Sequence, residues 1–314
     1  MKLRVIHETV YQYTPAVQNA QHMAHLRPRT GPAQRVLTHA LQIDPVPAQC
    51  EATQDVFGNT RAFFSLPFTH EGLRVRAESL LETTPQPPAP PGEPWEAVRE
   101  HLAYRRGMPY HPAAEFGFAS PYIPRHADFV TYASESFAPG RPLMDAARHL
   151  MSRIHADFSY TAHATDAGTP ALESLRLRRG VCQDFAHVMI GCLRSMGLAA
   201  RYVSGYLLTE PPPGQPRLVG ADASHAWVSV WSPAAVEGDG MDDDAEWFDL
   251  DPTNNRAAGE DYVTLAIGRD YSDVSPLRGV IHGGDHHVLQ VAVTVEPVEQ
   301  PLGFSPAAAP GQPG

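Results

Sequence analysis

The sequence contains little cysteine, little positive charge and no long apolar segment. Its three cysteines are an odd number and too few for a disulfide framework, so we expect a reducing compartment and free thiols. Lysine and arginine number 24 against 35 aspartates and glutamates, which gives a net charge of −11, and no lysine-rich run is present. This balance argues against nucleic acid or an anionic membrane surface as a partner.

No segment approaches the roughly 20 consecutive apolar residues that a membrane-spanning helix needs. The opening residues, 1–8, lack the apolar core of a secretion signal. We therefore expect a cytoplasmic protein with no membrane partner.

The composition that remains is that of a folded protein, with 43% hydrophobic and 19% charged residues. A length of 314 residues suggests about two domains. Residues 1–84 form the first, because segments such as 36–43 and 73–78 alternate with the period of two that is typical of strands. We predict a β-rich antiparallel sandwich or small barrel for this domain.

A proline-rich segment, residues 85–94, then denies the backbone donors that a sheet needs and favours a stiff linker. We assign residues 95–300 to a second domain. Residues 301–314, rich in proline, alanine and glycine, are predicted to be a disordered tail.

In the second domain, a cysteine follows a glycine at the expected start of a helix. Apolar residues recur after Cys182 at intervals of three and four, namely Phe185, Val188, Met189, Cys192, Leu193 and Met196. Gly197 supplies the stop. Cys182 thus lies in the first turn, where unpaired backbone N–H groups carry partial positive charge and favour thiolate over thiol. Cys182 is therefore a candidate nucleophile, whereas Cys50 and Cys192 are interpreted as small buried apolar residues.

Candidate partners for this thiol follow downstream. His225 begins a segment that alternates as a half-buried strand does. Asp251 ends a second strand, because Pro252 removes a ladder donor and restricts the residue before it. A thiol, an imidazole and a carboxylate are the groups that a nucleophilic triad requires. Asp249 lies two residues from Asp251 on the same side of an ideal strand, so the pattern leaves it open as the orienting carboxylate or as an ordinary exposed one.

Three sequence blocks, in this order, resemble the transglutaminase-like superfamily, and most closely its bacterial members. The blocks are residues 180–187 (GVCQDFAH), 224–227 (SHAW) and 251–254 (DPTN). The resemblance implies an α+β fold of the papain-like kind, in which the nucleophile helix packs against an antiparallel sheet that carries the histidine and the aspartate. It further implies Cys182 as nucleophile, His225 as base and later acid, and Asp251 as the residue that orients the imidazole.

The resemblance extends beyond this core. Residues 5–13 and 55–59 are similar to the β-rich N-terminal domain of bacterial relatives, and residues 269–276 are similar to a block that follows the core in the same group. Gln183 and Asp184 stand where the animal transglutaminases have a Cys-Trp pair. Oxyanion stabilisation and calcium control are therefore not carried over from those enzymes.

Other groups near the helix allow two interpretations. Asp184 and His187, three residues apart, can meet on one helix face as a supporting pair or as a surface contact. Arg178 and Arg179 could raise the positive potential or bind an acidic substrate, but we favour a solvated helix end.

Two segments contain metal-ligand residue types without a metal-site spacing. His282, Asp285, His286 and His287 lack a zinc pattern and are predicted to form a polar loop. The acidic residues between 237 and 246 lack the twelve-residue calcium loop and are predicted to be a solvated excursion between strands. We predict no cofactor and no metal.

The resemblance implies cysteine-dependent acyl transfer on glutamine-type or peptide amides through a thioester. The enzyme would be a transglutaminase or a peptidase/amidase that acts on a protein or peptide substrate, with water or an amine as acceptor. The alternative is a non-catalytic protein-binding module that retains the fold and uses its N-terminal domain as a docking surface.

Overall fold

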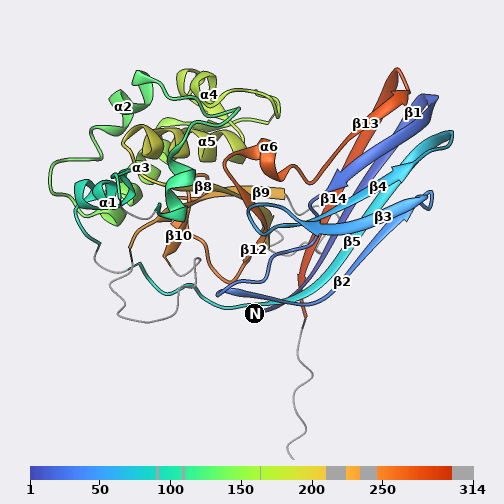
Figure 1. The fold of residues 1–314 in the computed structure, drawn as a ribbon, viewed down its shortest axis with the longest axis horizontal. Helices are drawn as coiled ribbons and strands as arrows, with labels where there is room; N and C mark the ends of the chain where they lie inside the picture. The colour runs from blue at the N-terminus through green and yellow to red at the C-terminus, as the bar shows by residue number, and fades with distance from the viewer. Residues whose placement is uncertain (90–91, 108–109, 163, 210–223, 234–245, 299–314) are drawn as a thin grey trace, which may run out of the picture.

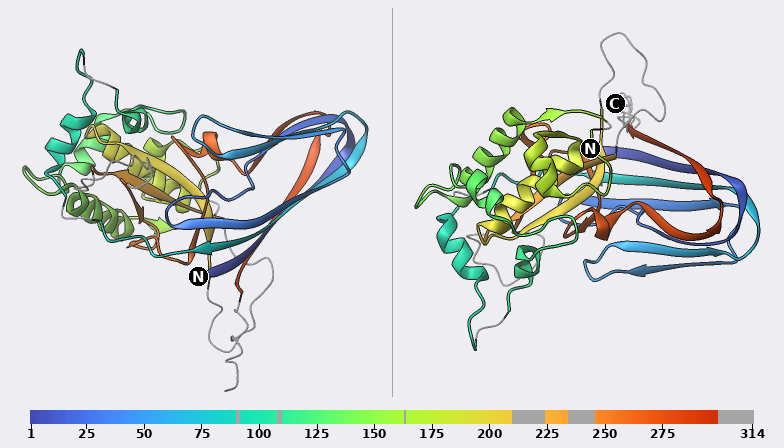
Figure 2. Two further views of the ribbon diagram at one scale, coloured as in Figure 1. Left: turned by 60° about the horizontal axis from the view of Figure 1, so that its bottom comes forward. Right: turned by 90° about the horizontal axis from the view of Figure 1, so that it is seen from above.

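A computed structural model of the protein describes residues 1–89, 92–107, 110–162, 164–209, 224–233 and 246–298. These residues form a large antiparallel sheet, a smaller antiparallel sheet and helices packed around the smaller sheet (Figure 1). The large sheet extends from the helical part as a curved half-barrel (Figure 2). The predicted α+β fold with a β-rich N-terminal domain is thereby confirmed.

The large sheet is built around one long strand, β1, which alternates buried and partly exposed residues over its first half. Its order is β2-β5-β1-β4-β3, with β13 and β14 also paired to β1. The strands are β1 (Lys2–Ala24), β2 (Gln34–Asp44), β3 (Gln49–Gln54), β4 (Thr60–Leu66), β5 (His70–Thr83), β13 (Leu277–Gly283) and β14 (His286–Pro297).

The two C-terminal strands differ from the predicted division of the chain. Residues 277–297 fall within the segment 95–300 that we assigned to the second domain, but they pair with β1. The register of β14 runs from Pro297 opposite Leu3 to His286 opposite Thr14. The pairing buries Val293 and Val295 beside Leu3, and this apolar burial explains why the chain returns to its first sheet.

The smaller sheet has the order β11-β10-β9-β8-β12, and all its pairs are antiparallel. Its strands are β8 (Ala200–Leu207), β9 (Ser224–Trp231), β10 (Trp247–Asp251), β11 (Arg256–Ala257) and β12 (Tyr262–Gly268). A separate parallel pair joins β6 (Ser159–Tyr160) to β7 (Arg179–Gly180). The strand expected to be half-buried around His225 is β9, and its residues after Ser224 are all buried.

Helix α5 (Cys182–Ser195) is the centre of this half of the molecule. It contacts β8 and β9 on one side and α2, α3 and α4 on the other, which explains why nearly all its residues are buried. It ends where predicted, because Gly197 adopts a positive φ of 85°. The other helices are α1 (Trp95–Leu102), the 3-10 helix η1 (Pro112–Gly117), α2 (Ala127–Ala133), α3 (Leu143–Asp157), α4 (Ala171–Leu177) and α6 (Tyr271–Val274).

The proline-rich segment forms no helix or strand over residues 84–89 and 92–93. It lies against the second half of the molecule, where Gln86 Nε2 donates to Asp249 Oδ2 at 3.2 Å and Ala89 packs on the core. The predicted tail, 301–314, lies outside the described residues. In the described part of the chain, no helix combines the length and apolar character that crossing a bilayer requires.

Candidate active site

Cys182 is the first residue of α5, as the helical period predicts. The carboxylate of Asp184 holds this helix start by accepting hydrogen bonds from Val181 N at 2.8 Å, Ser174 Oγ at 2.7 Å and Thr165 Oγ1 at 2.6 Å. It thereby satisfies one of the backbone donors that a helix leaves unpaired at its N-terminus.

The glycine of the Gly-Val-Cys block makes room for that carboxylate. A Cβ atom added at Gly180 would lie 2.3 Å from Asp184 Oδ2, a distance that real Cβ contacts do not show. Gly180 thus permits the helix N-terminus and its carboxylate to approach β7, and so fixes where Cys182 begins the helix.

His225 and Asp251 come from neighbouring strands of the smaller sheet. His225 lies at the start of β9 opposite Gly205 of β8, and Asp251 ends β10, which pairs with the other edge of β9. His225 Nε2 lies 2.7 Å from Asp251 Oδ2. The thiol of Cys182 acts on the same imidazole, because it contributes to raising the pKa of His225. Because Nε2 faces the carboxylate, Nδ1 is the nitrogen left for the thiol.

Asp251 is fully buried, and its two oxygens accept several further hydrogen bonds. Oδ2 accepts from Tyr262 Oη and Asn254 Nδ2, both at 2.7 Å. Oδ1 accepts from the backbone N of Thr253 at 2.8 Å and of Asn254 at 3.2 Å. The turn after β10 and the strand β12 thus hold the carboxylate in one orientation toward His225.

These contacts set the protonation states of His225 and Asp251. Burial lowers the pKa of His225, but hydrogen bonds and charges from Asp251 and Cys182 outweigh it and raise that pKa to about 9. Burial raises the pKa of Asp251, but the hydrogen bonds from His225, Tyr262 and Asn254 outweigh it and hold that pKa below its usual range. The imidazole is therefore cationic and the carboxylate anionic at neutral pH.

Asp249, the open alternative for the orienting carboxylate, has other partners. Its Oδ2 accepts from Trp227 Nε1 at 3.0 Å and from Gln86 at 3.2 Å. Burial raises its pKa, although hydrogen bonds from Ser229 and Trp227 oppose this. At 9% exposure it is also not the ordinary exposed carboxylate that the pattern allowed.

Asp184 and His187 do not pair with each other. His187 is fully buried, and its Nε2 accepts a hydrogen bond from the backbone N of Tyr271 at 3.2 Å. Burial lowers the pKa of His187 to about 3, so the ring is neutral. This hydrogen bond connects α5 to the start of α6.

Sequence patterns did not identify Tyr262 as a site residue, and they indicated no role for Asn254 although the DPTN block contains it.

The other two cysteines differ from each other in burial. Cys192 is buried in the apolar face of α5, as predicted, and burial raises its pKa. The interpretation of Cys50 as a buried residue is wrong, because it is exposed on strand β3.

Cys182 and His225 open into a cavity of about 260 Å³ between the two sheets. The smaller sheet and α5 provide one wall, including Tyr202 and Ser224, and β1 and β14 of the large sheet provide the other. The cavity gives a substrate direct access to the thiol.

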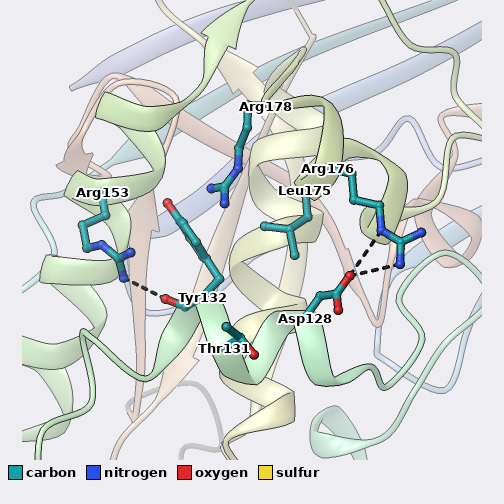
Figure 3. A pocket seen from close by; sticks show the side chains of 7 residues that line it. All are labelled: Asp128, Thr131, Tyr132, Arg153, Leu175, Arg176 and Arg178. Carbon is teal, nitrogen blue, oxygen red and sulfur yellow. Dashed lines mark hydrogen bonds and ion pairs between the residues drawn. The ribbon is translucent and has the colours of Figure 1, made fainter.

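A second cavity, of about 440 Å³, lies among α2, α3 and α4 (Figure 3). Arg153 and Arg178 pack over the Tyr132 ring, 4.5 and 4.2 Å from its centroid, and Arg176 pairs with Asp128 at 3.0 Å. Arg178 is the C-cap residue of α4 and its side chain is 41% exposed, so it lies at a partly solvated helix end and also packs on an aromatic ring. Among the described residues, none lines both this cavity and the cavity at Cys182.

The two segments that contain metal-ligand residue types do not form a cluster of such side chains in the described structure. His282 lies in β13, while His286 and His287 begin β14. Within the described ranges, no group of three or more His, Cys, Asp or Glu side chains is arranged to hold a metal ion. Of the acidic excursion, residues 237–245 lie outside the described residues, and Glu246 accepts a hydrogen bond from Trp231 Nε1 at 2.9 Å.

Comparison with known proteins places both halves of the chain. Residues 3–82 match the bacterial transglutaminase-like N-terminal region, and residues 131–252 match the transglutaminase-like superfamily. An uncharacterized protein of Mycobacterium tuberculosis is 42% identical over 306 residues, which cover 95% of this chain and 93% of that protein.

Two further proteins are more distant. A protein-glutamine gamma-glutamyltransferase of Pseudomonas aeruginosa is 32% identical over 102 residues, which are 32% of this chain and 14% of that protein. A crystal structure of a Cytophaga hutchinsonii protein described as a "putative cysteine protease" superposes with a TM-score of 0.70 at 18% identity. It covers 96% of this chain and 92% of the other, and shows that the two share their fold.

Proposed function

Because the chain belongs to the transglutaminase-like superfamily, we propose that it catalyses acyl transfer from glutamine-type or peptide amides through a thioester on Cys182. His225 is the general base and acid, and Asp251 orients it. The observation that carries this proposal is the position of one imidazole, 2.7 Å from a buried carboxylate and in the same cavity as the thiol.

In the first half of the reaction, the Cys182 thiolate attacks the amide carbon and forms a carbon–sulfur bond. The imidazolium of His225 then gives its proton to the departing nitrogen as the carbon–nitrogen bond breaks. Ammonia leaves from a glutamine side chain, or an amine from a peptide bond, and a thioester remains. Before this step Asp251 stabilises the positive charge of the imidazolium, and after it Asp251 holds the neutral ring in the same orientation.

In the second half, water or a primary amine attacks the thioester. Neutral His225 now takes a proton from the attacking group, the carbon–sulfur bond breaks and the thiolate–imidazolium pair is restored. Water yields a carboxylic acid, and an amine yields a new amide. Transglutaminase and hydrolase activities thus share one acyl-enzyme and differ in the second substrate.

Both tetrahedral intermediates carry a negative oxygen that needs hydrogen-bond donors. The backbone N of Cys182, at the N-terminus of α5, supplies one. The hydroxyl of Tyr202 is our candidate for the other, because Tyr202 lines the cavity with Cys182. Burial, and to a smaller extent the charge of Cys182, raises the pKa of Tyr202, so this hydroxyl keeps its proton.

The proposal is tested by intact-protein mass spectrometry after incubation with glutamine-containing peptides. We expect an acyl adduct on the wild type and none on Cys182→Ala. A primary amine such as methylamine then separates the two activities, because transfer gives an N-methyl amide and hydrolysis gives only the acid. Absence of an adduct across a broad amide library would contradict the proposal and favour the binding module.

A further inference from the structure

The large sheet forms one wall of the cavity that contains Cys182. Over its first residues, β1 packs directly on the smaller sheet, where Leu3 and Val5 form a core cluster with Tyr206. Farther along, the large sheet diverges from the helical half and extends past α6 (Figure 1). At that divergence, Thr9 and Tyr11 of β1 reach the Cys182 cavity.

Strand β14 continues this wall. Val291 lies opposite Thr9 and Leu289 opposite Tyr11 in the antiparallel register. All four side chains lie on the sheet face that lines the cavity. Nearer the contact between the sheets, Val293 is only 2% exposed, whereas Val291 and Leu289 are 52% and 49% exposed. The apolar residues on this face of β14 are thus buried at Val293 and exposed at Val291 and Leu289, beside the thiol.

The Tyr11 ring is fixed within this wall. It stacks on Tyr13, with ring centroids 5.9 Å apart, and contacts the ring of His287 at 5.8 Å. Tyr271 of α6 lines the cavity as well and contributes, after burial, to raising the pKa of Tyr11. A preformed aromatic surface costs little ordering when a ligand binds to it.

The described part of the cavity lining is poor in charged side chains. Among the described residues that line the cavity, none is Asp, Glu, Lys or Arg, in a chain with 35 acidic and 24 basic residues. His7 also lines it, and burial lowers the pKa of His7 to about 4, so this ring is neutral near pH 7. The charge that remains is that of the His225 imidazolium, which Asp251 already pairs. An ionic side chain beside the reacting amide would therefore lose water without gaining a partner.

From this wall we infer that the acyl donor is a peptide segment with a large apolar side chain next to its reactive amide, and that Tyr11, Leu289 and Val291 receive that side chain. The inference rests on the proposed function and names its substrate class. It gives the N-terminal sheet a specificity role in the reaction at Cys182.

The experiment measures kcat/KM for blocked peptides whose single glutamine is flanked by phenylalanine, serine, glutamate or lysine. For the wild type we expect at least about a tenfold preference for phenylalanine over glutamate and lysine. Leu289→Asn and Val291→Thr keep the side-chain size and remove apolar contact. Each is expected to reduce the preference about tenfold, the low end of the effect of losing a methyl-sized contact in an apolar pocket.

Val288→Thr is the matched control. Val288 is the same residue type on the same strand and is 56% exposed, but it lies on the other face and outside the cavity. We expect Val288→Thr to keep the wild-type preference. Equal rates for all four peptides, or the same loss of preference in Val288→Thr and Val291→Thr, would overturn the inference.

Binding to a Cys182→Ala variant separates this inference from the proposed function, because it needs no chemistry. Fluorescence anisotropy with the same labelled peptides should give tighter binding of the phenylalanine peptide, weakened by Val291→Thr. If this preference holds while the wild type forms no thioester, the proposed function fails and the binding surface stands. If a thioester forms and neither rate nor binding depends on the flanking residue, the inference fails and the proposed function stands.

Discussion

The hydroxyl of Tyr262 donates a hydrogen bond of 2.7 Å to Oδ2 of Asp251, the oxygen that also lies 2.7 Å from His225 Nε2. Three strands therefore meet at one carboxylate oxygen, since His225, Asp251 and Tyr262 come from β9, β10 and β12. A buried carboxylate with several donors remains ionised and cannot rotate away from the imidazole.

Tyr262→Phe removes one of those donors and leaves the ring in place. We expect the pKa of Asp251 to rise, because a hydrogen bond that favours the charged form is lost. The acid limb of the kcat/KM profile should move to higher pH by about one unit, for about 1.5 kcal/mol of charged hydrogen bond, while the rate at pH 7 changes little through this titration. An unchanged acid limb would show that Tyr262 does not act through Asp251.

Asp251→Asn and Asp249→Asn form a matched pair on one face of β10. The first removes the charge that raises the pKa of His225 to about 9 and leaves the burial that lowers it, so that pKa should fall toward or below 6.5. The imidazolium that protonates the leaving nitrogen is then lost at lower pH. The alkaline limb of kcat/KM should move down from near pH 9.

Asp249→Asn should leave this limb in place, because Asp249 bonds to Trp227 instead of His225. Measured pH profiles of both variants decide between the two carboxylates. A shift in Asp249→Asn alone would reverse their assignment.

Tyr202→Phe tests the second oxyanion donor. We expect kcat to fall by about 10²-fold, the usual effect of losing one such donor. Alkylation of Cys182 by iodoacetamide forms no tetrahedral oxyanion, so its rate should stay within about twofold. Equal losses in both rates would show that Tyr202 affects the thiol itself.

His22 gives the fold a sensitivity to acid. It is 5% exposed, stacks on Phe64 with centroids 5.1 Å apart, and has no hydrogen-bond partner for either ring nitrogen among the described residues. Burial, with a smaller effect of His70, lowers its pKa to about 4. Because the folded-state pKa lies below the ordinary 6.5, the unfolded chain takes up the proton first, and stability is lost as the pH falls from 6.5 to 4.

His22→Leu has similar volume and removes this titration. Its free energy of unfolding, relative to wild type, should increase as the pH falls from 6.5 to 4 in denaturant titrations. His25→Leu is the control at pH 7, where it should cost about 1 kcal/mol because His25 Nδ1 contacts the Ser275 carbonyl at 3.1 Å. A pH-independent difference between His22→Leu and wild type would contradict the account of His22.

The sequence predicts the local parts of this site well. The helical period and Gly197 locate α5, and Pro252 locates the end of β10, because these signals act over a few neighbouring residues. Periodicity could not choose between Asp249 and Asp251, since both lie on one face. Their distinction depends on Trp227 and Tyr262, which reach the carboxylates from neighbouring strands.

Sequence patterns do not predict which strands pair when they lie far apart in the chain. The alternation of residues 289–295 predicts a strand but contains no information on its partner, and that partner is β1, nearly 300 residues earlier. The cavity wall of Tyr11, Leu289 and Val291 depends on this pairing. The packing of Arg178 on Tyr132 is of the same kind, because α4 and α2 meet only in the folded chain.

In the proposed mechanism His225 and Asp251 activate Cys182, and the rates of iodoacetamide alkylation at individual cysteines near pH 7 test this activation without knowledge of the substrate. Cys50 is exposed and Cys182 only half-buried, so accessibility alone would favour Cys50, while Cys192 is buried. We expect peptide mass spectrometry to find Cys182 alkylated at least about tenfold faster than Cys50, and His225→Gln to abolish this difference. Equal rates at Cys182 and Cys50 in the native wild-type protein would contradict it.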